Sequence, residues 1–262
     1  MGRHLPFVVS HSALQASREG FGAATRSRDM FPDLTRDDVF RLETRRLWLR
    51  WPRHGDAGEI ATLAGDRAVA ETTARLPHPY PREAADAFVI ESRAAALRGE
   101  SLRLALAPKA QPTRLLGMIG VEPNGSGEAV LGYWLGRPFW GRGLATEATR
   151  AMIDAVFAFT RIEALSASVR VGNTASQRVL EKCGFLAEGP GFQDSPLRGR
   201  FPVDTFRLSR RDWASLKAWS RDGWAPTAEA PDLHVAEIAP AAPASGSAAS
   251  TAAGRPLFLA AE

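Results

Sequence analysis

A strand that is apolar on both of its faces restricts the fold of this chain more than any other feature. The stretch AVLGYWLG, residues 129–136, lacks the alternation of a half-exposed strand and is typical of a strand at the centre of a sheet. It leads through the glycine-containing turn FWGRG into residues 144–159, whose apolar residues recur at helical spacing. A buried strand followed by a short turn and an amphipathic helix is typical of α/β proteins.

Further strands and helices are predicted on both sides of this unit. Alternating apolar residues predict strands at 47–51, 101–107, 114–121, 165–170, 185–189 and 203–209. Helical spacing predicts helices at 58–65, 81–99 and 173–183, and we expect Asp56 and Glu59 to form a capping box at the start of the first. The expected fold is therefore α/β, with a mixed β-sheet of about six to seven strands and helices on both faces.

The two ends of the chain differ in composition from the middle. Residues 225–262 are rich in Ala, Pro and Ser and show little periodicity, so we expect a disordered tail. Residues 1–38 contain several arginines and serines and few acidic residues. We interpret them as a poorly ordered extension, with a resemblance to an organellar transit peptide as the alternative. The folded domain is accordingly expected at residues 39–213.

Composition and charge argue against several classes of function. The chain of 262 residues has 45% hydrophobic and 24% charged residues, as ordinary globular proteins do. Its formal net charge of +4 suits an anionic ligand, but without a long basic run we expect no direct binding to nucleic acid. The single cysteine, Cys183, permits neither an internal disulfide nor a cysteine zinc cluster, and favours a reducing, cytoplasmic location. No apolar run approaches the length of a membrane span, so we expect no membrane association.

Gly141 and Gly143 lie at the entrance to the predicted helix 144–159. The N–H groups of a first helical turn have no helical partner, and the helix dipole adds a partial positive charge there. Glycines remove the side chains that would keep an anion away, so the turn predicts a phosphate or pyrophosphate site, with a simple tight turn as the alternative. A P-loop is excluded because no Gly-Lys-Ser/Thr follows, and a Rossmann fingerprint is disfavoured because Thr146 replaces its third glycine.

A second motif, NTASQRVLEKCGF, begins at Asn173, which we expect to cap a helix that ends at Gly184. Together with three other stretches, this motif resembles the GNAT (GCN5-related N-acetyltransferase) superfamily, and within it the branch that includes the ribosomal-protein N-terminal alanine acetyltransferases. The resemblance covers about residues 42–210. The other stretches that carry it are LETRRLWLR (42–50), LPHPYPREAADAFV (76–89) and LGYWLGRPFWGRGLATEA (131–148).

The resemblance implies a splayed sheet and an acetyl-CoA-dependent N-acetyltransferase that needs no metal. Acetyl-CoA would be the co-substrate, and the acceptor would be a primary amine: a small molecule, or the N-terminus of a ribosomal or other protein. The enzyme would act as a monomer or homodimer. The glycine turn matches the family's Gln/Arg-x-x-Gly-x-Gly/Ala loop, which binds pyrophosphate through backbone amides, although a tryptophan stands at its first place. By this resemblance the cofactor-binding residues are Leu135, Trp140, Gly141, Arg142, Gly143, Leu144, Ala145, Thr146 and Asn173.

Three residues are candidates for proton transfer. Ser176 matches the family serine that is sometimes assigned as the acid that protonates the leaving thiolate; a solvated position on the helix surface is the alternative. An amine acceptor must lose a proton at neutral pH, and Glu122 and Glu128 are the candidate bases. Both glutamates also fit an exposed hairpin, EPNGSGE, without a catalytic role. Two other functions stay open: a non-catalytic acyl-CoA-binding module and a Rossmann-like nucleotide-binding domain.

Overall fold

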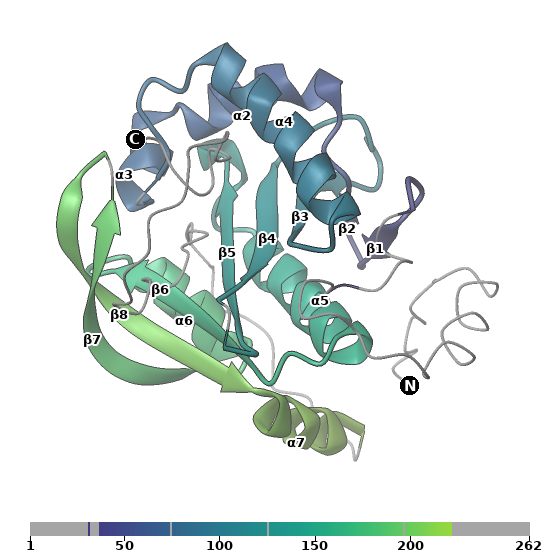
Figure 1. Ribbon diagram of the computed structural model, residues 1–262, viewed down its shortest axis with the longest axis vertical. Coiled ribbons are helices and arrows are strands. Elements are labelled where there is room, and N and C mark those ends of the chain that lie inside the picture. Colours follow the sequence, from purple (N-terminus) through teal and green to yellow (C-terminus); the bar gives the residue numbers. More distant parts are fainter. Residues whose placement is uncertain (1–30, 32–36, 74, 125, 196, 222–262) are drawn as a thin grey trace.

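The computed structural model describes residues 31, 37–73, 75–124, 126–195 and 197–221. This part of the chain forms an open sheet of eight strands in the order β1-β2-β3-β4-β5-β6-β8-β7 (Figure 1). The count exceeds the predicted six to seven because β1 has only three residues, too few to give a periodic signal. The strands are β1 Arg41–Glu43, β2 Leu47–Arg50, β3 Leu102–Pro108, β4 Gly117–Pro123, β5 Ala129–Leu135, β6 Ala164–Arg170, β7 Leu186–Ser195 and β8 Gly199–Ser209.

The central strands β5 and β6 separate soon after they meet. They are the sheet's one parallel pair among the described residues, and only Ala129–Leu165 and Val130–Ser166 are in register. From Leu131 to Leu135, β5 keeps its antiparallel partner β4 on one side and has no strand partner on the other. The sheet is therefore splayed at its centre, as the family resemblance implies.

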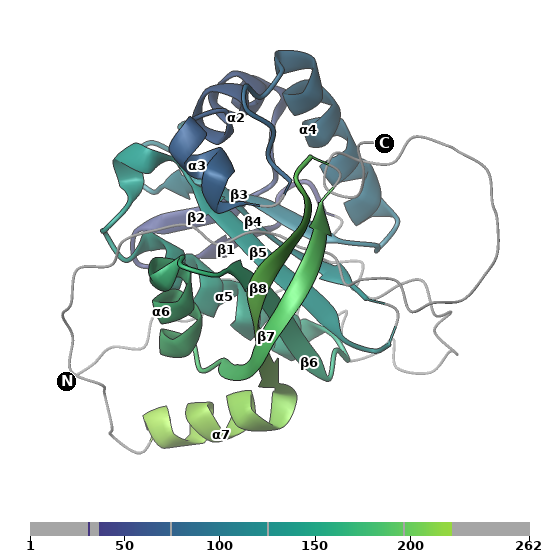
Figure 2. The same ribbon diagram turned by 90° about the vertical axis from the view of Figure 1, so that its left-hand side faces the viewer.

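Helices cover both faces of the sheet (Figure 2). One face carries the helices α2, α3 and α4, and the other carries α5 and α6. Successive residues of β5 point to opposite faces, so Trp134 packs in the apolar cluster under α2 and α4 while Tyr133 packs in the cluster with α5. The helices are η2 His54–Asp56, α2 Ala57–Ala64, α3 Arg67–Thr72, α4 Arg82–Leu97, η3 Arg137–Phe139, α5 Leu144–Phe159, α6 Thr174–Lys182 and α7 Arg210–Arg221.

The predicted capping box at the start of α2 is wrong. The Asp56 side chain makes no capping bond to α2 and instead receives two hydrogen bonds from the buried Arg50 guanidinium, at 2.7 and 2.8 Å. Glu59 accepts a hydrogen bond from the backbone N–H of Leu115 at 2.7 Å. The two carboxylates therefore join α2 and its entry turn to β2 and to the loop before β4, because a buried guanidinium and an otherwise unpaired backbone N–H need acceptors more than the helix end does.

The edge strand β7 is longer than the predicted strand 185–189. Gly189 has φ 123° and lies in an irregularity of the β7–β8 ladder, and Pro190 follows it within the strand. Because β7 is at the edge of the sheet, a proline that lacks an N–H removes no ladder hydrogen bond on the open side. Residues that look like strand breakers in the sequence are thus accommodated by their place at the edge.

Helix α7 was not predicted and extends the described fold beyond residue 213, where we expected the domain to end. Its first residue, Arg210, donates from its guanidinium to the carbonyl oxygens of Phe157, Thr160 and Ile162. These carbonyls lie at and after the end of α5, where helical acceptors have no helical donor. Trp213 packs on Phe157 and donates from Nε1 to Asp154 Oδ1 at 2.8 Å, so α7 is fastened to α5.

The predicted tail, 225–262, lies outside the described residues, as does most of the predicted extension, 1–38. Of the extension, Phe31 is buried in the main apolar cluster. The backbone oxygen of Asp37 accepts a hydrogen bond from Trp51 Nε1 at 3.0 Å, and Asp38 forms an ion pair with Arg93 of α4. These three residues therefore contact the folded domain.

Candidate functional site

A pocket lies where β5 ends, around the turn that leads into α5. Eight of the nine predicted cofactor-binding residues line it; Asn173 does not. Phe139 and Val179 also line it and were not predicted, because apolar residues on a turn and on a helix carry no sequence signal that separates them from the core. The lining residues are Leu135, Phe139, Trp140, Gly141, Arg142, Gly143, Leu144, Ala145, Thr146 and Val179.

The two glycines of the turn have a conformational role besides their lack of side chains. Gly141 has φ 75° and Gly143 has φ 66°, in the left-handed region that other residues adopt at a cost. Gly143 is the N-cap residue of α5, and no side chain caps this helix end. The first-turn N–H groups of α5 therefore border the pocket without a capping group, which leaves them able to bind an anion.

Thr146 places a hydroxyl group in this pocket. Its side chain is buried, and its Oγ1 has no hydrogen-bond partner among the described residues. Buried hydroxyl groups are almost always hydrogen-bonded in folded proteins. An unpartnered hydroxyl beside a helix N-terminus fits a site built for an anionic ligand such as pyrophosphate.

Trp140 anchors the turn to the strand before it. Its Nε1 donates to the carbonyl oxygen of Leu135 at 2.8 Å. The tryptophan stands where Gln or Arg is common in the family loop, and here its ring is partly buried against the apolar clusters of both faces. The end of β5 and the glycine turn are consequently held together.

The splay of the sheet leaves backbone groups on one side of β5 without a strand partner. The N–H of Gly136 bonds to Leu116 on the β4 side at 2.8 Å. Because N–H directions alternate along a strand, the N–H groups of Leu135 and Tyr133 point to the opposite side, where β6 has separated from β5. These groups can donate to a molecule that lies between the two strands.

Ser176 and Tyr133 meet at the start of α6. Asn173 caps this helix as predicted, with its Oδ1 accepting from the N–H of Ser176 at 3.1 Å. Ser176 Oγ lies 3.3 Å from the hydroxyl oxygen of Tyr133, and both side chains are buried, so the alternative of a solvated helix-surface serine is wrong. Burial raises the pKa of Tyr133 well above its ordinary value, so its hydroxyl stays protonated and can donate.

The two candidate bases lie in different surroundings. Glu122 is buried on β4, and its Oε1 accepts from Arg103 at 2.7 Å while Oε2 has no hydrogen-bond partner among the described residues. It is in register with Val130, the last residue of β5 that pairs with β6. Glu128 precedes β5 at the end away from the pocket and is paired with Arg207 at 2.6 Å. The geometry thus brings Glu122, and not Glu128, to the point where the strands part.

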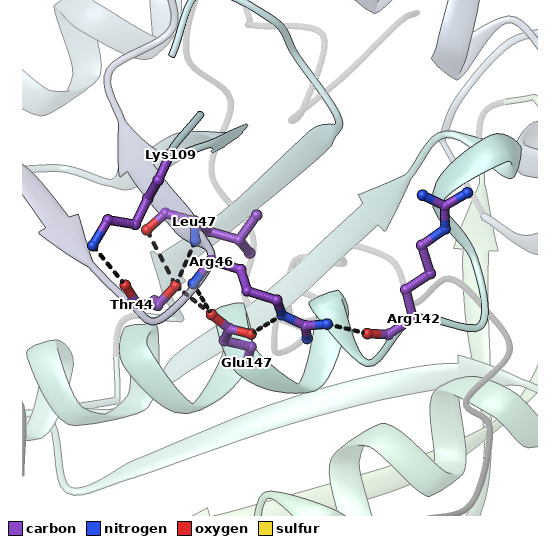
Figure 3. Close-up of polar contacts among 6 residues, drawn as sticks. All are labelled: Thr44, Arg46, Leu47, Lys109, Arg142 and Glu147. Carbon is purple, nitrogen blue, oxygen red and sulfur yellow. Dashed lines mark hydrogen bonds and ion pairs between the residues drawn. The ribbon is translucent and has the colours of Figure 1, made fainter. Parts of the chain in front are cut away.

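A polar network connects the glycine turn to the β1–β2 turn (Figure 3). Glu147, in the first turn of α5, accepts hydrogen bonds from Thr44 Oγ1 at 2.6 Å and from the N–H and Nε of Arg46 at 2.7 and 2.6 Å. The NH1 group of Arg46 donates to the carbonyl oxygen of Arg142 at 2.7 Å. Sequence reasoning missed this network, because its members are about a hundred positions apart and no spacing rule connects them.

No three His, Cys, Asp or Glu side chains in the described part of the chain are grouped so that they could hold a metal ion. Cys183 is buried and donates from Sγ to the carbonyl oxygen of Thr146 at 3.7 Å, as a packing residue would. None of the helices in the same residues is long and apolar enough to cross a membrane.

Solved structures of acetyltransferases share the fold. The self-immunity acetyltransferase MccE for microcin C7, in complex with acetyl-CoA and AMP, is 20% identical, covers 63% of this chain and 93% of its own, and has a TM-score of 0.55. An acetyl transferase from Salmonella typhimurium that modifies the N-terminal serine of ribosomal protein L7/L12 is also 20% identical. It covers 63% of this chain and 96% of its own, with a TM-score of 0.54. At such identities the likeness establishes the fold alone.

Sequence comparison goes further. The N-acetyltransferase p20 of Bacillus licheniformis, itself uncharacterized, is 29% identical over 176 residues, which are 66% of this chain and 98% of that protein. The sequence profile of the acetyltransferase (GNAT) domain matches residues 46–186, more than half of the chain, and includes the glycine turn, the splay and α6. With this match, the chain belongs to the GNAT family of acetyltransferases, whose members use acetyl-CoA as co-substrate.

Proposed function

We propose that this protein transfers the acetyl group of acetyl-CoA to a primary amine by direct attack of the amine on the thioester. The observation that carries the proposal is the uncapped N-terminus of α5, where two left-handed glycines and the buried hydroxyl of Thr146 surround one pocket beside the splay. In this proposal the pyrophosphate would bind at the helix end, and the linear arm of the coenzyme would lie between β5 and β6.

The acceptor amine is a protein N-terminus or a small molecule. The Salmonella neighbour modifies an N-terminal serine, and the microcin immunity enzyme was solved with AMP, so both classes of ligand occur on this fold. We propose the α-amino group of a ribosomal or other protein as the first class to test. We also place the reaction in the cytoplasm, since the free, buried Cys183 suits a reducing compartment.

Backbone groups and Asn173 would bind the coenzyme. The first-turn N–H groups of α5 and the Thr146 hydroxyl would donate to the pyrophosphate. The side-chain amide of Asn173 would reach the pantetheine arm, since α6 begins where β6 ends. The N–H groups of Tyr133 and Leu135 that face the splay would donate to the thioester oxygen as negative charge develops on it.

Proton transfer would involve one carboxylate and one hydroxyl. Glu122 lies where the strands part and has one carboxylate oxygen without a partner, so we propose that it accepts the proton of the amine, directly or through water. Ser176 would donate to the departing thiolate and in turn receive a hydrogen bond from Tyr133. Glu128, held by Arg207 at the far end of β5, is the less favourable candidate.

Gly143→Val is expected to raise the dissociation constant for acetyl-CoA by tenfold or more, about 1.4 kcal/mol. A β-branched side chain is strained at φ 66° and fills the space next to the first-turn amides. Gly127→Val is the matched control, because Gly127 also has positive φ but nothing lies within 4 Å of an added Cβ in its hairpin. Calorimetry should show weaker binding for Gly143→Val only; equal affinities in the two folded variants would contradict the assignment of the turn.

Coenzyme A release with a panel of amines tests the reaction itself. We expect release with at least one peptide N-terminus or small amine, together with a product heavier by one acetyl group. Glu122→Gln should lower kcat/KM by at least tenfold, whereas Glu128→Gln should change it less than twofold. A protein that binds acetyl-CoA but acetylates no amine in the panel would favour the non-catalytic acyl-CoA-binding module instead.

A further inference from the structure

We propose that Arg46 is a positioning residue, which orients the peptide between Arg142 and Gly143 so that its N–H faces the pyrophosphate of acetyl-CoA. The inference rests on the coenzyme site proposed above and concerns how that site is kept ready for its ligand. Arg46 does not line the pocket and lies on another part of the sheet, in the turn between β1 and β2.

The first step is the direction of one peptide group. Arg46 NH1 donates to the carbonyl oxygen of Arg142, so that oxygen points at the β1–β2 turn (Figure 3). The peptide bond from Arg142 to Gly143 is trans, and in a trans peptide the C=O and the following N–H point in opposite directions. The N–H of Gly143 therefore points away from Arg46, and Gly143 itself lines the pocket.

The second step is what prevents this peptide from turning over. A glycine on one side of a peptide group allows it to rotate more readily than other residues would, because glycine tolerates both signs of φ. Arg46 opposes that rotation with a guanidinium that is itself held, since its Nε donates to Glu147 Oε2 at 2.6 Å. Glu147 is fixed in turn by Thr44 Oγ1 and by the N–H of Arg46. The carbonyl of Arg142 is thus connected, through the Arg46 guanidinium and the Glu147 carboxylate, to the backbone of the β1–β2 turn.

The third step concerns charge. Glu147 lies in the first turn of α5, where an ionised carboxylate stabilises the helix but also repels a pyrophosphate bound at the same end. Burial alone would raise the pKa of Glu147, but the hydrogen bonds from Thr44 and Arg46 outweigh it and hold the pKa below its ordinary value. The carboxylate is therefore ionised at neutral pH, and the guanidinium of Arg46 offsets its charge next to the anion site. A lysine could not replace Arg46, because a single ammonium lacks the planar fork that reaches Glu147 and Arg142 together.

The test is calorimetric titration with coenzyme A of the full chain and three variants. Arg46→Ala removes the contact, and Arg46→Lys keeps the charge without the fork. Arg45→Ala is the matched control, because Arg45 is the preceding residue, is exposed, and has no hydrogen bond or ion pair with a described residue. We expect at least a tenfold higher dissociation constant for both Arg46 variants and less than a twofold change for Arg45→Ala. Thermal melting identifies any variant that does not fold. If Arg46→Ala does not fold, the milder substitution Arg46→Lys still tests the proposal.

The amide resonance of Gly143 provides a readout that a merely structural role would not change. Coenzyme A should shift this resonance in the unmodified protein and in Arg45→Ala, and should shift it much less in Arg46→Ala when coenzyme is saturating. The proposal is overturned if Arg46→Ala binds coenzyme A as tightly as Arg45→Ala does. It is also overturned if Arg46→Lys keeps full affinity for coenzyme A, because the charge alone would then suffice. If the unmodified protein does not bind coenzyme A, the coenzyme site itself is refuted; binding with no Arg46 effect refutes only the positioning role.

Discussion

Ser176→Ala is expected to lower kcat about 100-fold, the lower end of the effect of removing a general acid, while the affinity for acetyl-CoA changes less than twofold. The serine hydroxyl is buried beside the Tyr133 hydroxyl at the start of α6, and by our proposal it donates the proton that the departing thiolate takes up. Steady-state kinetics on an identified acceptor, with binding followed separately, measures both quantities. Asn173→Ala should instead mainly weaken the binding of acetyl-CoA, because the Asn173 amide would contact the pantetheine in ground and transition states alike.

Two further variants make this result interpretable. Ser215→Ala removes a hydroxyl from the exposed face of α7 and should leave kcat unchanged. Tyr133→Phe removes the partner of Ser176 and should lower kcat less than Ser176→Ala does, because the serine itself remains. Full turnover in Ser176→Ala would make water the proton donor and leave Ser176 with a packing role only.

Asp56→Ala is expected to lower the free energy of unfolding by about 3–5 kcal/mol, because it leaves a buried guanidinium without its counter-charge. Arg50 and Asp56 form a two-pronged pair at 2.7 and 2.8 Å, and both are almost fully buried. The pair joins β2 to the turn that starts α2, which covers the face of the sheet opposite α5. Urea unfolding followed by circular dichroism measures the change.

An exposed ion pair is the control for this prediction. Glu71→Ala breaks the pair between Arg67 and Glu71 on α3, whose side chains are largely in solvent, and should leave the unfolding midpoint unchanged. Asp56→Asn keeps the shape and one acceptor oxygen and should lie between the native protein and Asp56→Ala. If Asp56→Ala unfolds at the same urea concentration as Glu71→Ala, the buried pair does not stabilise the fold.

Much of the fold could be predicted because its signals are local. The apolar run 129–136, the helical spacing of 144–159 and the cap at Asn173 each depend on neighbours within a few positions, and all three elements are present. Elements without a local signal were missed. Strand β1 is too short to alternate, and α7 depends on Arg210 and Trp213 contacting residues in and just after α5 that lie 48 and 59 positions earlier in the chain.

The candidate site also has features that could be predicted from the sequence and features that could not. The glycine turn could be located from the sequence, because two glycines before an amphipathic helix are a local signal, and the structure gathers the residues from Trp140 to Thr146 around one pocket. The carboxylates could not be assigned from the sequence, because Glu122 and Glu128 lie six positions apart on one hairpin. Their different partners, Arg103 and Arg207, come from other strands.

The sequence by itself determined the alternation of strands and helices, the glycine turn at the start of α5 and the family, because each of these depends on the order of residues along a short stretch. Only the tertiary structure decided which buried polar groups are satisfied and by what. Asp56 is paired with Arg50, the serine at the start of α6 is buried against a tyrosine of β5, and the carbonyl of the glycine turn is held by Arg46. The physical reason is that burial and hydrogen bonding are properties of groups brought together by folding, and residues a hundred positions apart give no sign in the sequence that they will meet.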